Sequence, residues 1–395
     1  MNCYPWTKAL LAAGLVSLPA VINAEEKPSS VLTSLSSTTL SGYVDTSAQW
    51  NIGTGNAHTP NYAFGGPSKA DGFNLNVVKL SLEKPIDPAD AWGAGYKVDL
   101  LFGPDADALF TQSTGVGGDF AVKQAYVSLH APVGNGLDFK VGVWDTIIGY
   151  EVFESINNPN FTRSYGYTME PTTHTGIQMA YQFCPVFSAA VGIANTFGPT
   201  INERAFPTKA ESYKTYMGSM TFTAPTNWGF LAGSTLSGCV INGFNSASPS
   251  VAGPADQTSY YVGATIMTPV TGLKVGACYD YAGVSHQPIT VGTDHPSGYA
   301  NAVGGYASYQ LTEKLSVYGR GEYASSGTSA AFEARKVVEG TITLQYDLWK
   351  NVLSRLEARW DHAADGSKPY GGTFADDEGS KKNSYILIAS IAYKF

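Results

Sequence analysis

Residues 385–395, Tyr-Ile-Leu-Ile-Ala-Ser-Ile-Ala-Tyr-Lys-Phe, end the chain, and every second residue of this stretch is apolar or aromatic. Successive side chains of a β-strand point to opposite faces, so one face of a strand here would be apolar throughout. Its aromatic ends, Tyr385 at one side and Tyr393 with Phe395 at the other, would lie about 33 Å apart at about 3.3 Å per residue. Strand tilt brings that length down to the apolar thickness of a membrane.

The aromatic terminal residue also indicates how such a strand is used. A last strand that ends in this way resembles the assembly signal of outer-membrane β-barrels, in which the last strand pairs with the first. We therefore expect Tyr385, Tyr393 and Phe395 to form an assembly signal that the barrel-assembly machinery binds. A soluble β-sandwich could also end on an edge strand, although a terminal Phe without a polar tail is unusual there.

The N-terminal residues are typical of a protein that is exported from the cytoplasm. Residues 1–24 carry Lys8, an apolar run over 9–20 and small residues near Ala24, which predicts a cleaved signal peptide. Residues 25–38, rich in Ser and Thr, are expected to form a short periplasmic lead-in. No later stretch has the roughly 18 consecutive apolar residues of a membrane helix. An exported chain that enters a membrane without such a helix must be a barrel, so residues 39–395 are predicted to form one transmembrane β-barrel.

Composition supports this class and excludes others. Charged residues make up 14% of the chain, against about 25% in soluble proteins. The formal net charge of −8 argues against a nucleic-acid partner. Three cysteines follow the predicted signal peptide, an odd number that does not indicate a disulfide framework. No Cys pair or His-x-x-x-His helix is present, and we expect no metal and no cofactor. The three cysteines are Cys184, Cys239 and Cys278.

Alternating segments recur along the whole chain, and their connections alternate between short and long. Short turns on the periplasmic side and long outer loops are typical of an antiparallel up-and-down transmembrane barrel, as is an even strand number. We predict about 16 strands; an 18-strand channel is the nearest alternative. The predicted strands are 39–51, 72–84, 92–103, 119–131, 136–145, 173–184, 186–197, 212–224, 228–239, 257–269, 272–283, 298–311, 314–325, 334–347, 352–363 and 383–395.

Several strands alternate clearly enough to assign faces. In 352–361 the apolar residues Val352, Leu356, Ala358 and Trp360 alternate with four charged residues. If the apolar face meets lipid, the charged residues line a water-filled lumen. By the same alternation Leu344 and Leu356 face lipid, whereas Thr343 meets water. Segments 72–84 and 119–131 change phase midway, so their faces stay unassigned. The predicted lumen wall includes Arg320, Glu322, Arg355, Glu357, Arg359 and Asp361.

The most distinctive part of the sequence is the stretch 140–176, KVGVWDTIIGYEVFESINNPNFTRSYGYTMEPTTHTG. Together with GYVDTSAQWN at 42–51 and AVKQAYVSLHAPVG at 121–134, it resembles the OmpL-like putative β-barrel porin family. The shared markers are Gly-Tyr-Glu after the strand at 136–145, then Pro171 and His174 before the next strand. The resemblance covers essentially the whole mature chain. It implies a bacterial outer-membrane porin and says little about the solute.

The loop 146–172 is the longest predicted connection, and long loops in compact structures are usually functional or disordered. Its many aromatic residues argue against disorder. We therefore expect it to fold into the lumen as a constriction; an extracellular cap is the alternative. Its acidic residues would face Arg320, Arg355 and Arg359 across the lumen, so replacing Glu151 and Glu154 with Gln should shift selectivity toward anions. The expected constriction residues are Glu151, Glu154, Arg163 and Glu170.

Sixteen strands leave an aqueous channel, which favours passive diffusion of small hydrophilic solutes. The alternatives are a barrel enzyme of protease or phospholipase type and a structural or adhesive barrel. The chain has no Gly-x-Ser-x-Gly motif, and of its histidines only His174 and His362 fall near outer strand ends, so no catalytic residues are expected. Lipid, lipopolysaccharide and, by analogy with general porins, two further copies in a homotrimer are the expected partners. The other histidines are His58, His130, His286 and His295.

Overall fold

The structure of the chain is a computed structural model. It describes residues 37–53, 55–109, 111, 118–205, 212–244, 256–284, 298–327, 332–373 and 378–395. The predicted signal peptide 1–24 lies outside these residues, as do the predicted lead-in up to residue 36 and both His286 and His295.

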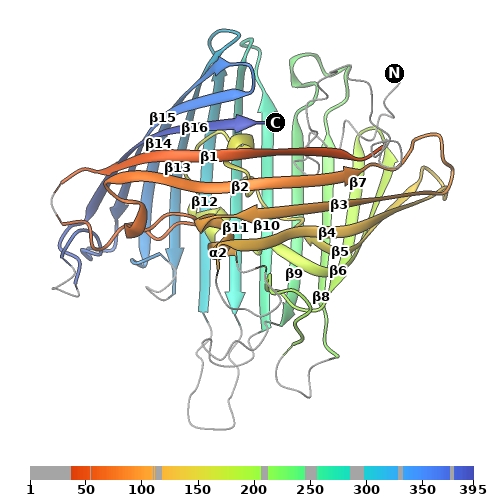
Figure 1. The fold of residues 1–395 in the computed structure, drawn as a ribbon, viewed down its shortest axis with the longest axis horizontal. Helices are drawn as coiled ribbons and strands as arrows, with labels where there is room; N and C mark the ends of the chain where they lie inside the picture. Colours follow the sequence, from red (N-terminus) through yellow and green to blue (C-terminus); the bar gives the residue numbers. More distant parts are fainter. Residues whose placement is uncertain are drawn as a thin grey trace, which may run out of the picture.

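Sixteen strands form one closed antiparallel barrel (Figure 1), in which each strand pairs with its neighbours in sequence and β1 pairs with β16. The strand number, the antiparallel order and the closure confirm the predicted fold. The strands are β1 (Thr39–Asn51), β2 (Gly72–Lys84), β3 (Gly93–Phe102), β4 (Phe120–Ala131), β5 (Leu137–Asp145), β6 (Thr173–Cys184), β7 (Phe187–Ala194), β8 (Thr215–Thr223), β9 (Thr235–Phe244), β10 (Asp256–Met267), β11 (Leu273–Val284), β12 (Gly298–Gln310), β13 (Leu315–Ser326), β14 (Lys336–Trp349), β15 (Val352–Ala363) and β16 (Asn383–Lys394).

Strand β9 begins later than the sequence pattern predicts. The prediction placed a strand over 228–239, but part of that range belongs to a compact connection that includes the 3-10 helix η4 (Gly229–Leu231). Gly229 and Gly233 adopt φ values of 60° and 82°. These left-handed values interrupt an extended backbone and are tolerated by glycine, which lacks a Cβ. The turn before β9 is therefore longer than predicted.

The other helices are short and lie in the long loops. They are η1 (Pro67–Lys69), α2 (Pro104–Leu109), η2 (Ser155–Asn157) and α3 (Tyr165–Met169). In the described part of the chain, no helix combines the length and the hydrophobicity needed to cross a membrane.

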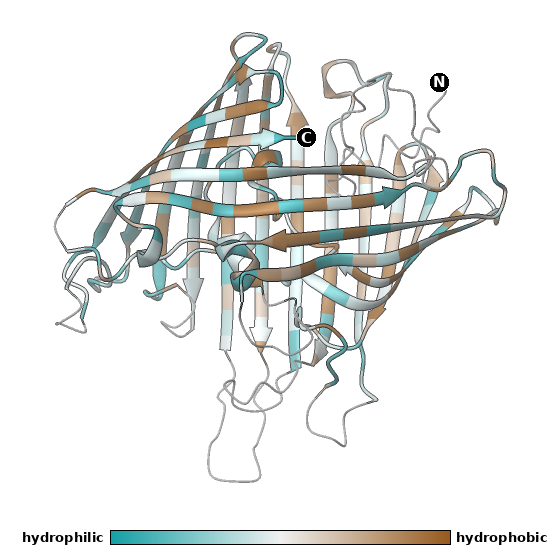
Figure 2. Ribbon diagram, viewed as in Figure 1, coloured by the Kyte–Doolittle hydropathy of each residue, from teal (hydrophilic) through white to brown (hydrophobic). Residues whose placement is uncertain are grey.

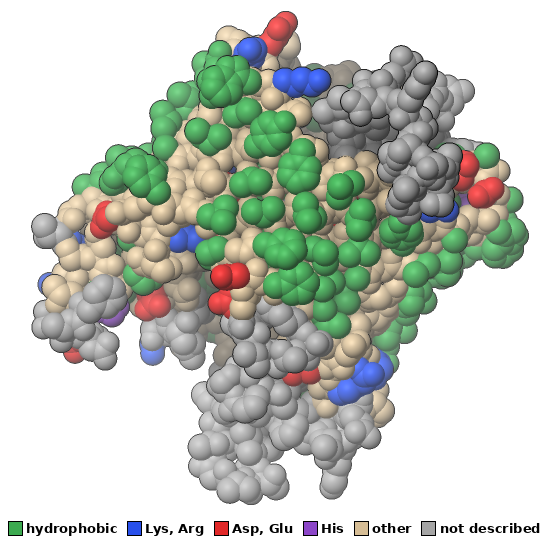
Figure 3. All heavy atoms as spheres, viewed as in Figure 1, with side chains coloured by type: hydrophobic (Ala, Val, Ile, Leu, Met, Phe, Trp, Pro, Cys, Tyr) green, Lys and Arg blue, Asp and Glu red, His purple; other side chains and the backbone are tan. Residues whose placement is uncertain are grey.

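The outer face of the barrel is apolar, as the alternation predicts. Ile342 and Leu356 are 59% and 61% exposed, whereas the neighbouring Thr341 and Glu357 point inward and are buried. Hydrophobic and hydrophilic residues alternate along the strands in Figure 2, and hydrophobic side chains cover a broad part of the outer surface in Figure 3. These exposures confirm the face assignments made for β14, β15 and β16.

Two β-bulges explain the strands whose alternation changes phase. Between β1 and β2 the register shifts so that Asn76 is an extra residue, and between β3 and β4 the extra residue is Lys123. An extra residue in one strand puts two consecutive side chains on the same side of the sheet. Asn76 and Val77 are both buried, and so are Lys123 and Gln124. Each strand therefore keeps one inner face despite its change of phase.

The barrel closes through the last residue of the chain. Gly42 N donates to the carbonyl oxygen of Phe395 at 2.9 Å, and Phe395 N donates to the carbonyl oxygen of Gly42 at 3.0 Å. The Phe395 ring lies against β1: a Cβ added to Gly42 would be 2.7 Å from its Cζ atom. Because deletion of Phe395 removes both hydrogen bonds and this ring contact, we expect less heat-resistant folded barrel in outer-membrane fractions.

The matched control for this deletion is Phe395→Tyr, which keeps the backbone pairing and the ring. We expect it to retain the wild-type amount of folded barrel. Equal yields and equal heat-modifiable gel mobility for wild type and the deletion would contradict the role of Phe395.

Candidate functional site

The segment 146–172 between β5 and β6 runs through the interior of the barrel, where its yellow-green ribbon is visible in Figure 1. We call this segment the inner loop. It contains η2 and α3, and its hydrogen bonds reach inward-facing side chains of β13 and β15, on the side of the closed barrel opposite β5 and β6. The inner loop therefore crosses the lumen from one wall to another.

Side chains of the inner loop brace its own backbone. Asn158 forms two hydrogen bonds with Val152, from Val152 N at 2.8 Å and to Val152 O at 2.7 Å. Ser164 caps the N-terminus of α3 by accepting a hydrogen bond from Tyr167 N at 3.0 Å. The guanidinium of Arg163 is 4% exposed and donates to three backbone carbonyl oxygens of the same loop. Arg163 thus stabilises the fold of the loop and does not extend into open lumen.

Carboxylates of the barrel wall accept hydrogen bonds from the backbone of the inner loop. Glu322 on β13 accepts from Tyr165 N at 2.6 Å and from Gly166 N at 2.7 Å. Glu357 on β15 accepts from two successive N–H groups, at Phe161 and Thr162. A buried N–H needs such a partner, because an unpaired one costs about as much as a lost hydrogen bond.

Arginines of the same wall donate to the carbonyl oxygens of the loop. Arg355 donates to the carbonyl oxygens of Ser155 and Asn158, both at 2.7 Å. Arg359 donates to the carbonyl oxygen of Arg163 at 2.7 Å and also bonds Asp361. Asp361 in turn accepts from the hydroxyl of Tyr165 at 2.7 Å. The wall and the loop together form one hydrogen-bonded network.

This network corrects two expectations from the sequence. The charged residues of β13 and β15 were expected to line water, and the loop was expected to face Arg320, Arg355 and Arg359 across the lumen. Instead these three arginines are 2–4% exposed and contact the loop directly. The reason is that the backbone groups of an inserted loop need partners, and the charged side chains of the wall supply them. Opposite charges therefore meet, and no field is set up across open water.

Glu151 and Glu154 are paired as well. Glu151 Oε1 lies 2.9 Å from Arg320 Nη1, and Glu154 forms ion pairs with Lys79 and Lys123. Burial by itself would raise the pKa of Glu154, but Lys123 and Lys79 outweigh it and hold that pKa below its ordinary value. Replacing both carboxylates with Gln would remove one acidic partner from each of these buried cations, which keep Asp99, Asp145 and Glu339 as partners. The expected shift toward anions stays a prediction.

Glu170, at the end of the inner loop, meets a different environment. Burial raises its pKa well above the ordinary value, and the neighbouring Asp280, to which it is hydrogen-bonded, raises it further. The start of the loop lies close to the same carboxyl group, since a Cβ added to Gly149 would be 2.3 Å from Glu170 Oε2. A protonated Glu170 can donate to Asp280 and so join the end of the loop to β11.

Apolar contacts hold the inner loop where charges do not. The ring of Tyr150 stacks on Tyr306 of β12, with centroids 4.2 Å apart. Ile147 and Ile148 pack in the same cluster, against side chains from β7 to β12. Phe153 packs in a second cluster with residues of β1 to β4. Since these clusters and the charged network lie on different sides of the barrel, the loop is fixed along most of its length.

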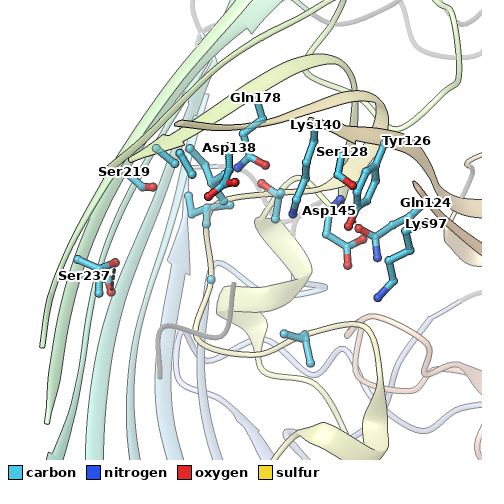
Figure 4. A pocket seen from close by; sticks show the side chains of 18 of the residues that line it. Lys97, Gln124, Tyr126, Ser128, Asp138, Lys140, Asp145, Gln178, Ser219 and Ser237 are labelled. Atoms are coloured by element: carbon cyan, nitrogen blue, oxygen red, sulfur yellow. Dashed lines mark hydrogen bonds between the residues drawn. The ribbon is translucent and has the colours of Figure 1, made fainter. Parts of the chain in front are cut away.

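A cavity of about 1290 Å³ remains between the inner loop and the inner faces of β3 to β10. Figure 4 shows Lys97 and Lys140 pointing into this space, with Ser219 and Ser237 on its other side. The lining extends from the short turns 85–91 and 132–136 to Thr146, at the opposite end of β5. Among the described lining residues, β7 to β10 contribute no charged side chain. The cavity thus has a charged wall and a wall of small hydroxyl, glycine and alanine residues.

The sequence analysis did not predict the charged wall of the cavity. Lys123 lies at the bulge of β4, where the change of phase hides its face. Lys97 and Lys140 do alternate with apolar residues in their strands, so alternation could have placed them on the inner face. Lys97 bonds Glu83 at 3.2 Å, and Lys123 forms ion pairs with Asp145 and Glu154.

The described histidines are held by structural contacts. His174 is fully buried and its Nε2 lies 3.1 Å from Thr146 Oγ1; the Nδ1 atom of His362 is 2.8 Å from Asn383 Oδ1. His130 Nδ1 lies 2.8 Å from Asp138 Oδ1, and His58 pairs with Gly371 through the backbone. In the ranges that the structure describes, no three His, Cys, Asp or Glu side chains are grouped so that they could hold a metal ion.

Comparisons with known proteins point to one class. The family described as "Putative beta-barrel porin-2, OmpL-like" matches residues 37–395. No curated protein matches the chain.

Solved structures share the fold at low sequence identity. The anion-selective porin from Comamonas acidovorans is 14% identical with a TM-score of 0.61, over 91% of this chain and 99% of that one. The outer membrane channel DcaP of Acinetobacter baumannii is 14% identical with a TM-score of 0.59, over 91% and 97%. The trimer form of OmpT, an outer membrane protein of Vibrio cholerae, is 14% identical with a TM-score of 0.54, over 91% and 99%.

Proposed function

The chain belongs to the OmpL-like family of β-barrel porins of the outer membrane, and from this premise we propose that small hydrophilic solutes diffuse through it along one side of the lumen. The path is the cavity between the inner loop and the inner faces of β3 to β10. The inner loop occupies the remaining part of the lumen at the level of its contacts with β13 to β15.

The observation that carries this proposal is the extent of the cavity. Its lining includes Gly136 before β5 and Thr146 after it, so the space accompanies that strand over its whole length. Its lining includes the charged side chains of β3 to β5 and the hydroxyl groups of β8 and β9, which suit hydrated solutes. A volume of about 1290 Å³ is larger than the pockets of about 300–1,000 Å³ that hold drug-sized ligands.

The predicted constriction and wall residues take a modified role in this proposal. The inner loop is held in place by its own acidic residues Glu151, Glu154 and Glu170, and Arg163 stabilises its backbone. The wall residues of β13 and β15 form hydrogen bonds with it. Together these residues set the width of the path by holding the loop against one wall. Glu151, Glu154 and Glu170 also line the cavity, so their side chains form part of the wall of the proposed path.

The experiment combines planar bilayers with a thiol reagent. In a background in which Cys184, Cys239 and Cys278 are alanine, Ser237→Cys places one thiol in the cavity, and Ser390→Cys places one on the inner face of β16, where it is 5% exposed. We expect single-channel currents from both variants. A charged methanethiosulfonate should reduce the conductance of the Ser237→Cys variant and leave that of the Ser390→Cys variant unchanged.

Each outcome bears on a separate part of the proposal. Absence of conductance from folded wild-type barrel would contradict diffusion. A conductance that falls only for the Ser390→Cys variant would place the path on the side of β16, and the proposed position would be wrong.

Membership of the porin family supports a channel and not a barrel enzyme. The trimer form of the Vibrio protein supports the expected homotrimer for this chain too. Contacts with lipopolysaccharide and with the barrel-assembly machinery stay predictions.

A further inference from the structure

Lys140 differs from Lys97 and Lys123, which lie on the same charged wall of the cavity. Lys97 and Lys123 have carboxylate partners. Lys140 has none within ion-pair distance among the residues that the structure describes, and its ammonium group lies 5.1 Å from the centroid of the Tyr126 ring. Lys140 is half-buried and lines the cavity. Its positive charge therefore faces the proposed path without a neutralising acid.

Two polar side chains flank Lys140 in the sheet. Ser128 on β4 and Gln178 on β6 are its direct partners in register, one on each side. Side chains at directly paired positions have Cβ atoms about 4.5–5.5 Å apart, so the three form one row across the inner face. All three line the cavity, and Figure 4 shows them extending from neighbouring strands into its space. The row offers an ammonium, a hydroxyl and an amide, each of which can donate hydrogen bonds.

We propose that Lys140, Ser128 and Gln178 form a binding subsite for the carboxylate of a small monoanionic solute. The inference rests on the proposed function, because the solute reaches the row through the porin's path. A carboxylate has two oxygens and about four acceptor positions, which matches a row of donors. Charge-assisted hydrogen bonds from the ammonium supply most of the affinity.

The surrounding charges favour one negative charge over two. Asp138 and Asp145 lie near Lys140 on the same wall, and their own partners are His130 and Lys123. A dianion would bring a second negative charge beside these two carboxylates, which repel it. An uncharged solute would leave the ammonium without a partner. A single carboxylate with an uncharged remainder fits the row best.

The test measures binding without ion flow. The full chain is folded in detergent, and propionate is titrated while its saturation-transfer NMR signal is recorded. We expect saturable binding to the wild type and a dissociation constant at least about tenfold higher for Lys140→Gln, because a charge-assisted hydrogen bond is lost. Lys140→Arg keeps the charge and should stay within about threefold. Lys274→Gln, on β11 and outside the cavity lining, is the matched control and should bind like the wild type.

Two further probes define the ligand class. Propionamide has the shape of propionate without its charge and should not bind measurably. Inorganic phosphate should compete more weakly than propionate. Equal binding of propionate to wild type and Lys140→Gln in folded samples would overturn the subsite, and stronger competition by phosphate would overturn the monocarboxylate. Because no current is measured, a barrel that does not conduct would contradict the proposed function and leave this test intact.

Discussion

Replacing Arg320 with Gln is expected to lower the free energy of unfolding by about 3–5 kcal/mol and to raise the single-channel conductance. Arg320 joins Glu151 of the inner loop to Glu339 of β14, at 2.9 and 3.1 Å, and all three side chains are at most 1% exposed. It also donates to Thr162 O at 2.7 Å. Removing the guanidinium leaves two buried carboxylates without their cation, which costs more than the pair itself contributes.

The conductance should rise because the loop loses its central attachment to β13. The measurements are urea unfolding in lipid vesicles and single-channel recording in planar bilayers. Arg335→Gln is the matched control: Arg335 is exposed immediately before β14, and its replacement should change stability by no more than about 0.5 kcal/mol. Adding Glu151→Gln to the Arg320→Gln variant should recover part of the loss. Wild-type stability and conductance in Arg320→Gln would show that the loop does not depend on this pair.

Leu356→Arg is expected to destabilise the barrel by about 2–4 kcal/mol, because it places a cation on the lipid face near the middle of a strand. Leu356 is 61% exposed on the outer surface and pairs with Leu344 of β14, which is 41% exposed. Leu344→Arg should have a similar effect. The free energies come from urea titrations of barrels folded into vesicles.

The control for these variants has to face water. The sequence pattern suggests Thr343, one residue from Leu344, but Thr343 is fully buried and bonds both Glu357 and Asn160 at 2.6 and 2.7 Å. Thr343 therefore does not meet water as the alternation predicted, and arginine at this position would disrupt the loop network. Ser237→Arg, in the wall of the cavity, should cost about 1 kcal/mol through its lost hydrogen bond with Thr221. Equal losses for Ser237→Arg and Leu356→Arg would contradict the assignment of the outer face.

Periodicity was sufficient for the barrel, because each strand has to present one face to lipid and the other to the interior. The alternation of 352–361 and 385–395 predicted which side chains point outward, and the structure confirms it. Local backbone geometry limited the prediction elsewhere. Positive φ values at Gly229 and Gly233 moved the start of β9, and the bulges at Asn76 and Lys123 hid two inner faces.

The composition of the 146–172 loop indicated that it packs against something, since its aromatic residues are too dense for a disordered segment. Several partners of its charged and backbone groups could not be predicted, because they come from residues more than 150 positions away. Arg320 and Glu151 are an example, and Glu322 with Tyr165 is another. The same distance in sequence separates the loop from β15, whose charges looked water-facing when only their own strand was considered.

The sequence by itself therefore determined the architecture, the strand count and the apolar outer surface, since these follow from a two-residue period and from the length of each connection. Only the tertiary structure decided what fills the lumen. Backbone groups of an inserted loop must be satisfied wherever the closed barrel places them, and the charged wall of β13 to β15 supplies the partners. Because the loop lies against β13 to β15, a cavity remains beside β3 to β10. Lys140 faces this cavity without an ion-pair partner among the described residues.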